Sequence, residues 1–137
     1  MLQERFSKQT DFSPRLIATN NLDREFLEKA ELVIEKHIEN TDFDVPLFAS
    51  EMAMGRTKLF SKIKGITGQT PNDFILTVKL KKAASYLTNN PEYNISDITY
   101  MTGFSSPKYF AKCFREQFGV SPSAFRKSEE MEEEMEE

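Results

Sequence analysis

The chain has 137 residues, 39% of them hydrophobic, and this length suits a single domain with a packed core. It has no apolar run long enough to cross a membrane, no secretory leader after Met1 and only one cysteine, so we expect a cytoplasmic protein without an internal disulfide. The net charge of −4 is unevenly divided: residues 43–127 carry 12 Lys and Arg against 6 Asp and Glu, whereas residues 128–137 carry seven Glu and no base.

The first 40 residues divide into an irregular stretch and a helix. Residues 1–22 lack any periodicity and contain Pro14, so we expect a linker or an adherent arm. From Asp23, a candidate N-cap, to Asn40 the apolar positions recur at helical spacing. They are Phe26, Leu27, Ala30, Val33, Ile34, His37 and Ile38. The only histidine lies in this stripe, which favours a packed or rim residue over a metal ligand, because no cluster of further ligands accompanies it.

A first helix-turn-helix unit is predicted over about residues 45–65. Its second helix should run from about Arg56 to Gly65, with Leu59, Phe60 and Ile63 facing inward. The outward face carries Thr57, Ser61 and Lys64, with Lys58 beside them and Arg56 and Lys62 on the flanks.

A long helix is predicted over about residues 71–89, with Thr70 as its N-cap and Pro71 at its first position. The core stripe consists of Phe74, Ile75, Val78, Ala83 or Ala84, and Leu87. The lysines at positions 79, 81 and 82 either reach phosphates or simply keep the surface solvated, and the sequence leaves both open.

A second unit is predicted over about residues 95–118. A short helix should end at Gly103, where a positive φ is inexpensive, and a second should begin at Pro107 with Ser106 as its N-cap. In that second helix Phe110 and Phe114 share one side. The opposite side carries Lys108, Lys112 and Arg115. A lysine-rich face is often only a solvated face, so this helix alone does not decide the function.

The two units repeat one another. Val45, Phe48, Ala53 and Met54 pair with residues 50 positions later, namely Ile95, Ile98, Gly103 and Phe104. Beyond the turn the offset is 51, which pairs Leu59 with Phe110, Ile63 with Phe114, Lys64 with Arg115, Gly68 with Gly119, Pro71 with Pro122 and Phe74 with Phe125. Two copies of one helix-turn-helix motif favour a DNA-binding protein.

From about Phe26 to Lys127 the sequence resembles the AraC/XylS class of transcription regulators, above all in GITGQTPNDF and GFSSPKYFAKCFREQFGVSPSAFR. The resemblance implies an all-α fold of about seven helices over residues 23–127, with two helix-turn-helix subdomains, a homeodomain-like pair, joined by a long central helix. It implies sequence-specific binding of double-stranded DNA, without a cofactor and with RNA polymerase as a possible further partner. Two residues depart from the family pattern: Gly55 stands where an N-cap Ser is usual, and Ser61 where Arg is frequent.

Residues 1–22 resemble the connector that precedes this domain in hybrid two-component regulators. The resemblance implies a phosphorelay protein, with sensor, kinase and receiver parts upstream and dimerisation through them.

The predicted DNA-binding residues lie on the second helix of each unit and at its start. They are Arg56, Thr57, Lys58, Ser61, Lys62, Lys64, Ser106, Lys108, Lys112 and Arg115. Only Arg115, among the three cations of the second unit, has the planar fork that reads guanine O6 and N7, whereas lysines more often contact phosphates.

Other functions are less well supported by the sequence. Five glycines and one histidine supply no catalytic constellation and no metal cluster, so we expect no enzyme activity in this chain. A protein-interaction module that has lost DNA binding is the main alternative, and it should show apolar anchors where this chain shows cations. Cys113 is expected to be a packing residue. The tail, residues 128–137, should be disordered or loosely helical, and either remains solvated or competes with DNA for the basic face.

Overall fold

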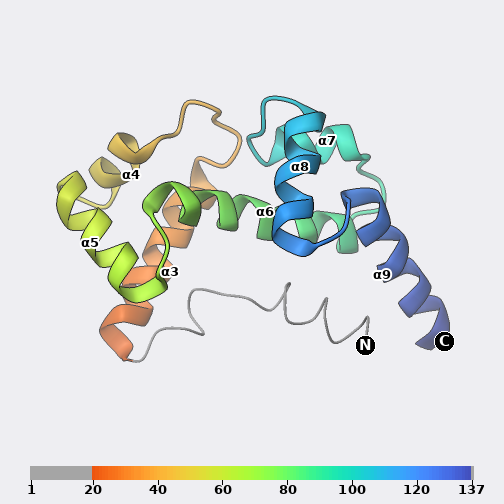
Figure 1. Ribbon diagram of the computed structural model, residues 1–137, viewed down its shortest axis with the longest axis horizontal. Coiled ribbons are helices and arrows are strands. Elements are labelled where there is room, and N and C mark those ends of the chain that lie inside the picture. Colours follow the sequence, from red (N-terminus) through yellow and green to blue (C-terminus); the bar gives the residue numbers. More distant parts are fainter. Residues whose placement is uncertain (1–19, 137) are drawn as a thin grey trace. The chain divides into compact units, whose positions relative to one another are not determined.

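A computed structural model of the protein describes residues 20–136, and within them the fold is entirely helical (Figure 1). The seven helices of this part are α3 (Asn21–Lys36), α4 (Val45–Glu51), α5 (Arg56–Thr67), α6 (Pro71–Asn89), α7 (Ile95–Met101), α8 (Pro107–Phe118) and α9 (Pro122–Glu136). The predicted fold class is therefore confirmed. The predicted arm at residues 1–22 lies almost wholly outside the described residues.

The chain forms two compact units, and the boundary between them in the sequence falls within α6, after Lys79. The described part of the first unit comprises residues 20–79, with α3, α4, α5 and the first half of α6. The described part of the second comprises residues 80–136, with the rest of α6 and α7, α8 and α9. Each unit thus contains one helix-turn-helix pair and a share of the long central helix.

Helix α3 begins and ends earlier than predicted. Its N-cap is Asn20, whose side-chain oxygen accepts from the backbone N–H of Asp23 at 2.8 Å, so the assignment of Asp23 as N-cap is wrong. The helix ends at Lys36, and His37 is its C-cap. The imidazole of His37 stacks on Phe43 at a ring-centroid distance of 5.0 Å, which makes it the packed residue that the sequence predicted.

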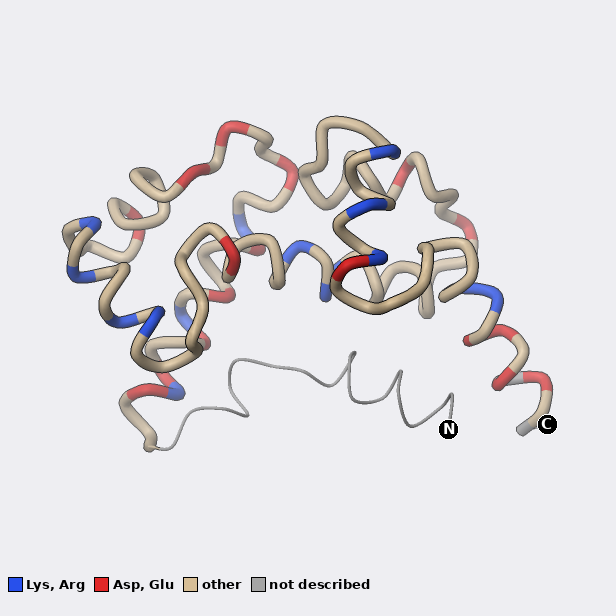
Figure 2. The backbone as a smooth tube through the Cα atoms, viewed as in Figure 1, with Lys and Arg blue, Asp and Glu red and all other residues tan. Residues whose placement is uncertain are grey.

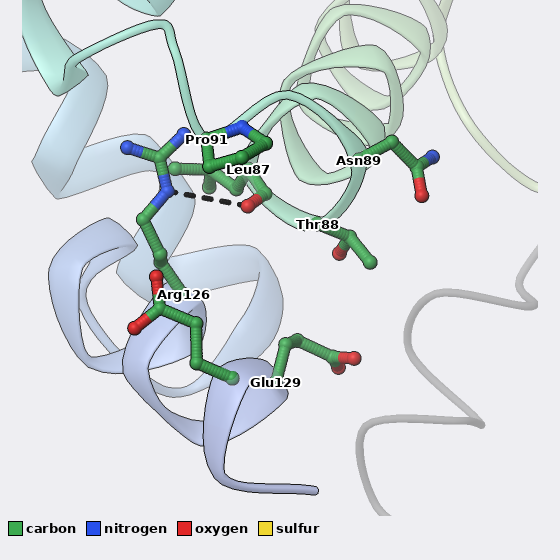
Figure 3. A pocket seen from close by; sticks show the side chains of 7 residues that line it. Leu87, Thr88, Asn89, Pro91, Arg126 and Glu129 are labelled. Atoms are coloured by element: carbon green, nitrogen blue, oxygen red, sulfur yellow. Dashed lines mark hydrogen bonds between the residues drawn. The ribbon is translucent and has the colours of Figure 1, made fainter. Parts of the chain in front are cut away.

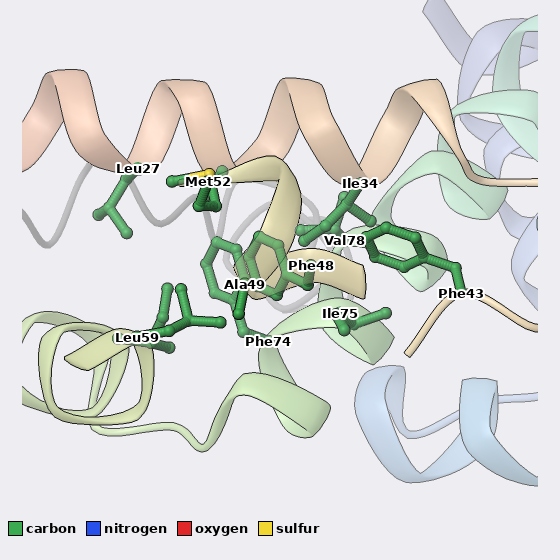
Figure 4. Packing of buried hydrophobic residues seen from close by; sticks show 12 residues of the cluster. Leu27, Ile34, Phe43, Phe48, Ala49, Met52, Leu59, Phe74, Ile75 and Val78 are labelled. Carbon is green, nitrogen blue, oxygen red and sulfur yellow. The ribbon is translucent and has the colours of Figure 1, made fainter. Parts of the chain in front are cut away.

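The core of the first unit draws on all four of its helices (Figure 4). Leu27 and Ile34 from α3, Phe48 from α4 and Leu59 from α5 are fully buried. Phe74 of α6 stacks on Phe48 with a centroid distance of 6.4 Å. Burial of side chains this large contributes roughly 1.5–3 kcal/mol each, so this core holds α5 against the remainder of the unit.

Helix α6 spans residues 71–89 as predicted, with Pro71 as its first residue. The Thr70 hydroxyl accepts from the backbone N–H of Asp73 at 3.2 Å, which confirms the predicted cap. The predicted stripe is buried, from Phe74 at one end to Leu87 at the other. Because the apolar residues continue through Leu80, Ala83 and Ala84, one helix supplies core to both units.

The second unit has an aromatic core. Phe104, Phe110, Phe114, Phe118 and Phe125 are all buried. Phe114 contacts its neighbours with centroid distances of 5.7 Å to Phe110, 4.5 Å to Phe118 and 5.4 Å to Phe125. Such tilted and edge-on ring pairs add about 0.5–1.5 kcal/mol each beyond their burial, so α8 is held against α9 and the loop after α7.

Arg126 of α9 joins that helix to the end of α6 (Figure 3). Its Nε donates to the carbonyl of Leu87 at 3.2 Å, and Nη2 donates to the carbonyl of Asn90 at 3.2 Å. The last carbonyls of a helix have no partner within it, so a cation at this position satisfies them and complements the helix dipole. Arg126 therefore has a structural role.

The acidic tail is helical. Helix α9 continues through it to Glu136, so the expected disorder of residues 128–137 is not observed in the described part, and the helical alternative is the one found. The side chains of Met131 and Met135, four residues apart, are 56% and 84% exposed. Among residues 20–136, none of the helices is both long enough and apolar enough to span a membrane.

Candidate nucleic-acid interface

The outward face of α5 presents the predicted residues to solvent. Arg56, Thr57, Lys58, Ser61, Lys62 and Lys64 are all exposed. Helix α5 contains no Asp or Glu, so its whole surface is cationic or neutral (Figure 2). Its N-cap, Gly55, makes no side-chain capping bond, which leaves the N–H groups of the first turn uncapped by a side chain. This end of the helix is consequently suited to an anion such as a phosphate.

Two lysines of α5 are engaged within the first unit. The ammonium of Lys62 lies over the Phe26 ring of α3, 5.1 Å from its centroid. The ammonium of Lys64 donates to the carbonyl of Gly68 at 3.1 Å, at the C-terminal end of the same helix. Both side chains are exposed and an ammonium group has three donors, so these contacts leave donors available to a phosphate.

Phe60 is placed differently from the prediction. Its side chain is 47% exposed, so the expectation that it faces inward with Leu59 and Ile63 is wrong. Those two residues are fully buried and suffice to hold α5 against the core. Phe60 lies at the edge of the buried stripe, where about half of its side chain is left in contact with solvent.

The outward face of α8 has the more concentrated charge. Lys108, Lys112 and Arg115 are exposed at i, i+4 and i+7, so they follow one side of the helix (Figure 2). A shallow hollow of about 630 Å³ runs along this side and is lined by these three together with Ser106, Tyr109, Ala111 and Glu116. The predicted cations of the second unit are thus brought together on one surface.

The start of α8 is capped as predicted. The Ser106 hydroxyl accepts from the backbone N–H of Tyr109 at 3.2 Å, and Pro107 is the first helical residue. Because the cap oxygen is already used, Ser106 serves first to fix where α8 begins. Its place in the lining of the hollow still leaves it within the candidate surface.

Tyr109 is a surface residue that the sequence reasoning missed. Its ring is 49% exposed and packs against Phe104 with a centroid distance of 6.0 Å. Interaction with the buried Cys113 thiol, one helical turn away, raises the pKa of the Tyr109 hydroxyl. A tyrosine hydroxyl is both a donor and an acceptor, so at this exposed position it is able to donate to a phosphate oxygen. In the sequence, the only indication that Tyr109 belongs to the candidate interface is its position next to Lys108.

The lysines of α6 are partly buried. Burial lowers the pKa of Lys79, and the ammonium of Lys82 lies over the Tyr86 ring at 5.5 Å from its centroid. Lys79, Lys81 and Lys82 are all half-buried, so full solvation does not describe them, and their contact with phosphates stays a prediction. Within residues 20–136, no group of three or more His, Cys, Asp or Glu residues is placed to hold a metal ion.

Comparison with known proteins gives a consistent picture. A family model described as a helix-turn-helix domain matches residues 48–128. The histidine kinase P4 of Formosa agariphila is 42% identical over 125 residues, which cover 91% of this chain but only 9% of that protein.

Solved structures share the fold. The DNA-binding domain of AdpA, a global transcriptional factor solved in complex with a target DNA, superposes with a TM-score of 0.65 and 26% identity, over 74% of this chain and 89% of that one. A transcriptional regulator of Chromobacterium violaceum, of the type with an AraC-type DNA-binding domain, gives a TM-score of 0.72 at 24% identity over 80% of this chain and 96% of that one.

Proposed function

We propose, from the premise that this chain belongs to the AraC-type family of helix-turn-helix DNA-binding domains, that it binds double-stranded DNA sequence-specifically as the output domain of a transcription regulator. The observation that carries the proposal is the row of Lys108, Lys112 and Arg115 along the exposed side of α8. A helix of this kind is the element that helix-turn-helix proteins insert into the major groove.

The two units divide the work of binding. The domain is proposed to extend over residues 23–127, with one helix-turn-helix at about 45–65 and the other at about 95–118. Each unit reads one half-site. Half-sites that lie in successive turns of the major groove have centres about 10 base pairs apart. Because the outward residues of α5 and α8 differ, the two half-sites should differ in sequence.

The ten predicted side chains take different parts in this proposal. Arg115 is the residue best able to read guanine, whereas Lys58, Lys108 and Lys112 supply positive charge for phosphates. A protein-interaction module would be expected to expose, at the centre of the α8 face, a large apolar side chain that becomes buried when the partner binds. The exposed face of α8 is cationic at those positions, which favours DNA.

The wider protein is proposed to be a two-component regulator. Support comes from the histidine kinase P4, in which the matching segment is a small fraction of a much longer chain. Phosphorelay control, dimerisation through other domains and a contact to RNA polymerase belong to this wider proposal.

The proposal is tested by selecting bound sequences from a pool of random duplexes and measuring the affinity of the selected duplex at several salt concentrations. We expect two different motifs about one helical turn apart, and an affinity that falls steeply as salt rises. Recovery of no motif, together with an affinity equal for all duplexes, would contradict sequence-specific binding.

A further inference from the structure

The ring of Phe60 is 47% exposed and is surrounded on the helix by polar and cationic side chains. It lies on the second helix of the first unit, and its neighbours at i−4, i−3 and i+4 on the helix surface are Arg56, Thr57 and Lys64. All three are exposed and belong to the proposed interface. Because the Phe60 side chain is about half exposed among polar and cationic side chains, it is available for contact with a partner that approaches α5.

The second unit has no aromatic ring at the equivalent position, and its exposed ring, Tyr109, stands at the position paired with Lys58. The position paired with Phe60 in the repeat is Ala111, a small and half-buried residue of α8. The second helices of the two units therefore expose different chemical groups. Helix α8 presents the cations Lys112 and Arg115. Helix α5 presents Ser61 at the position paired with Lys112, and the apolar ring of Phe60 beside it.

The chemistry of the major groove identifies what such a ring would recognise. Each base pair presents its own pattern of groups in the major groove, and the group unique to thymine is the apolar C5-methyl, which apolar side chains including Phe contact. With Ser61 in place of a planar donor, α5 has no fork with which to read guanine at the centre of its face.

We infer that Phe60 is a specificity-determining residue that reads a thymine methyl group in the half-site bound by the first unit, with Thr57 adding its own methyl beside the ring. The inference rests on the proposed DNA binding. It assigns sequence discrimination in this half-site to apolar contact rather than to an arginine.

The test removes single methyl groups from the DNA. In the duplex selected from the random pool, each thymine is replaced in turn by deoxyuridine, which keeps the pairing edge and lacks only the C5-methyl. For the full chain we expect one or two positions, all within one half-site, at which affinity falls about fourfold, the effect of losing one buried methyl group. In Phe60→Ala the same replacements should have a much smaller effect, because only the Thr57 methyl remains beside the thymine.

Leu32→Ala is the matched control, because Leu32 is an apolar residue of the same unit that is 67% exposed on α3, outside α5. It should reproduce the deoxyuridine profile of the unaltered protein. Phe60→Leu, which keeps an apolar side chain, covers the case in which the Ala variant does not fold, and should show a reduced but measurable dependence on the same methyl groups.

A crosslinking measurement on the unaltered protein provides an independent readout. With 5-iododeoxyuridine at the sensitive position, irradiation should attach the DNA to Phe60, as located by mass spectrometry. A deoxyuridine profile identical in the unaltered protein and Phe60→Ala, or a crosslink on α8 alone, would overturn the inference while leaving DNA binding intact. Absence of binding to any duplex would overturn the proposed function and the inference with it.

Discussion

Ala53 and Gly103 occupy the same position in the turns of the two helix-turn-helix units, and both have a left-handed backbone, with φ of +57° and +81°. A second pair agrees, since Gly68 and Gly119 end α5 and α8 with φ of +77° and +81°. The repeat read from the sequence is thus a repeat of backbone conformation. Ala53 is the only non-glycine residue with a positive φ among the described residues.

Replacing Ala53 with Gly should stabilise the first unit. An L-residue in the left-handed region costs roughly 1–2 kcal/mol. Glycine removes this cost but destabilises the folded state by about 0.4–1 kcal/mol, because it raises the entropy of the unfolded chain. We expect a net gain of about 0.5–1 kcal/mol in the free energy of unfolding, measured by urea denaturation. The matched change Gly103→Ala should destabilise the protein, and equal effects of the two changes would contradict this account.

Two glycines of α5 should respond oppositely to alanine. Gly65 lies within the helix, and a Cβ at this position would meet open space, so Gly65→Ala should stabilise by about 0.5–1 kcal/mol. Gly68 also has open space, but its φ of +77° strains any side chain, so Gly68→Ala should cost about 1 kcal/mol. Thermal melting of both variants checks the prediction. If the melting temperature changed in the same direction in both, local space rather than backbone conformation would determine the effect of the added Cβ.

Local signals made most of the fold predictable. A cap, a proline at the first helical position and an apolar stripe all agree for α6 and α8, and both begin where the sequence predicts. The start of α3 was less determined, because Asn20 and Asp23 are both good N-cap residues. Its end was overestimated because Ile38 is buried beyond the last helical turn, which extends the apolar pattern without extending the helix.

The candidate site was predictable in part. The cations of α8 lie opposite a full aromatic stripe, so their exposure follows from the periodicity alone. The exposure of Phe60 does not, because a residue at the edge of a stripe is covered only if another element reaches it, and that depends on tertiary packing. The same holds for Tyr109, whose exposed ring rests on Phe104 from the preceding loop.

Glu51 should make the first unit sensitive to acid. The His37 ring at 3.3 Å and, secondly, the Lys36 ammonium at 3.7 Å hold the pKa of the Glu51 carboxyl below its usual value of 4.5. A lowered pKa means that the carboxylate contributes stability above about pH 4.5, and that this contribution is lost as the pH falls through the lowered value. Urea midpoints measured from pH 6 to pH 3 should therefore fall less steeply for Glu51→Gln. An identical slope for the two proteins would show that this contact does not contribute.

Alanine at Lys112 or Arg115 should weaken operator binding. If the side chain reads a base, we expect a loss of about 1–3 kcal/mol that depends on the sequence of one half-site. If it holds a phosphate, the loss should be similar for all duplexes, and the salt slope should fall by about one. Fluorescence anisotropy with Lys29→Ala as control, an exposed lysine of α3, separates loss of contact from loss of net charge. Unchanged isotherms for both variants would remove α8 from the interface.

Deleting residues 129–137 should strengthen DNA binding, and more so at low salt. The deletion removes seven glutamates from the unit that carries α8, and their repulsion of DNA is screened over about 10 Å at 0.1 M salt. Replacing the seven glutamates with glutamine separates charge from helix, because it keeps the length of α9 and removes only the charge. If the tail acts electrostatically, the two variants should bind alike, with affinities that converge on that of the unaltered protein as salt rises. Tighter binding by the deletion alone would instead indicate that the helical tail blocks DNA by its bulk, and an unchanged affinity at low salt would show that the tail has no part in binding.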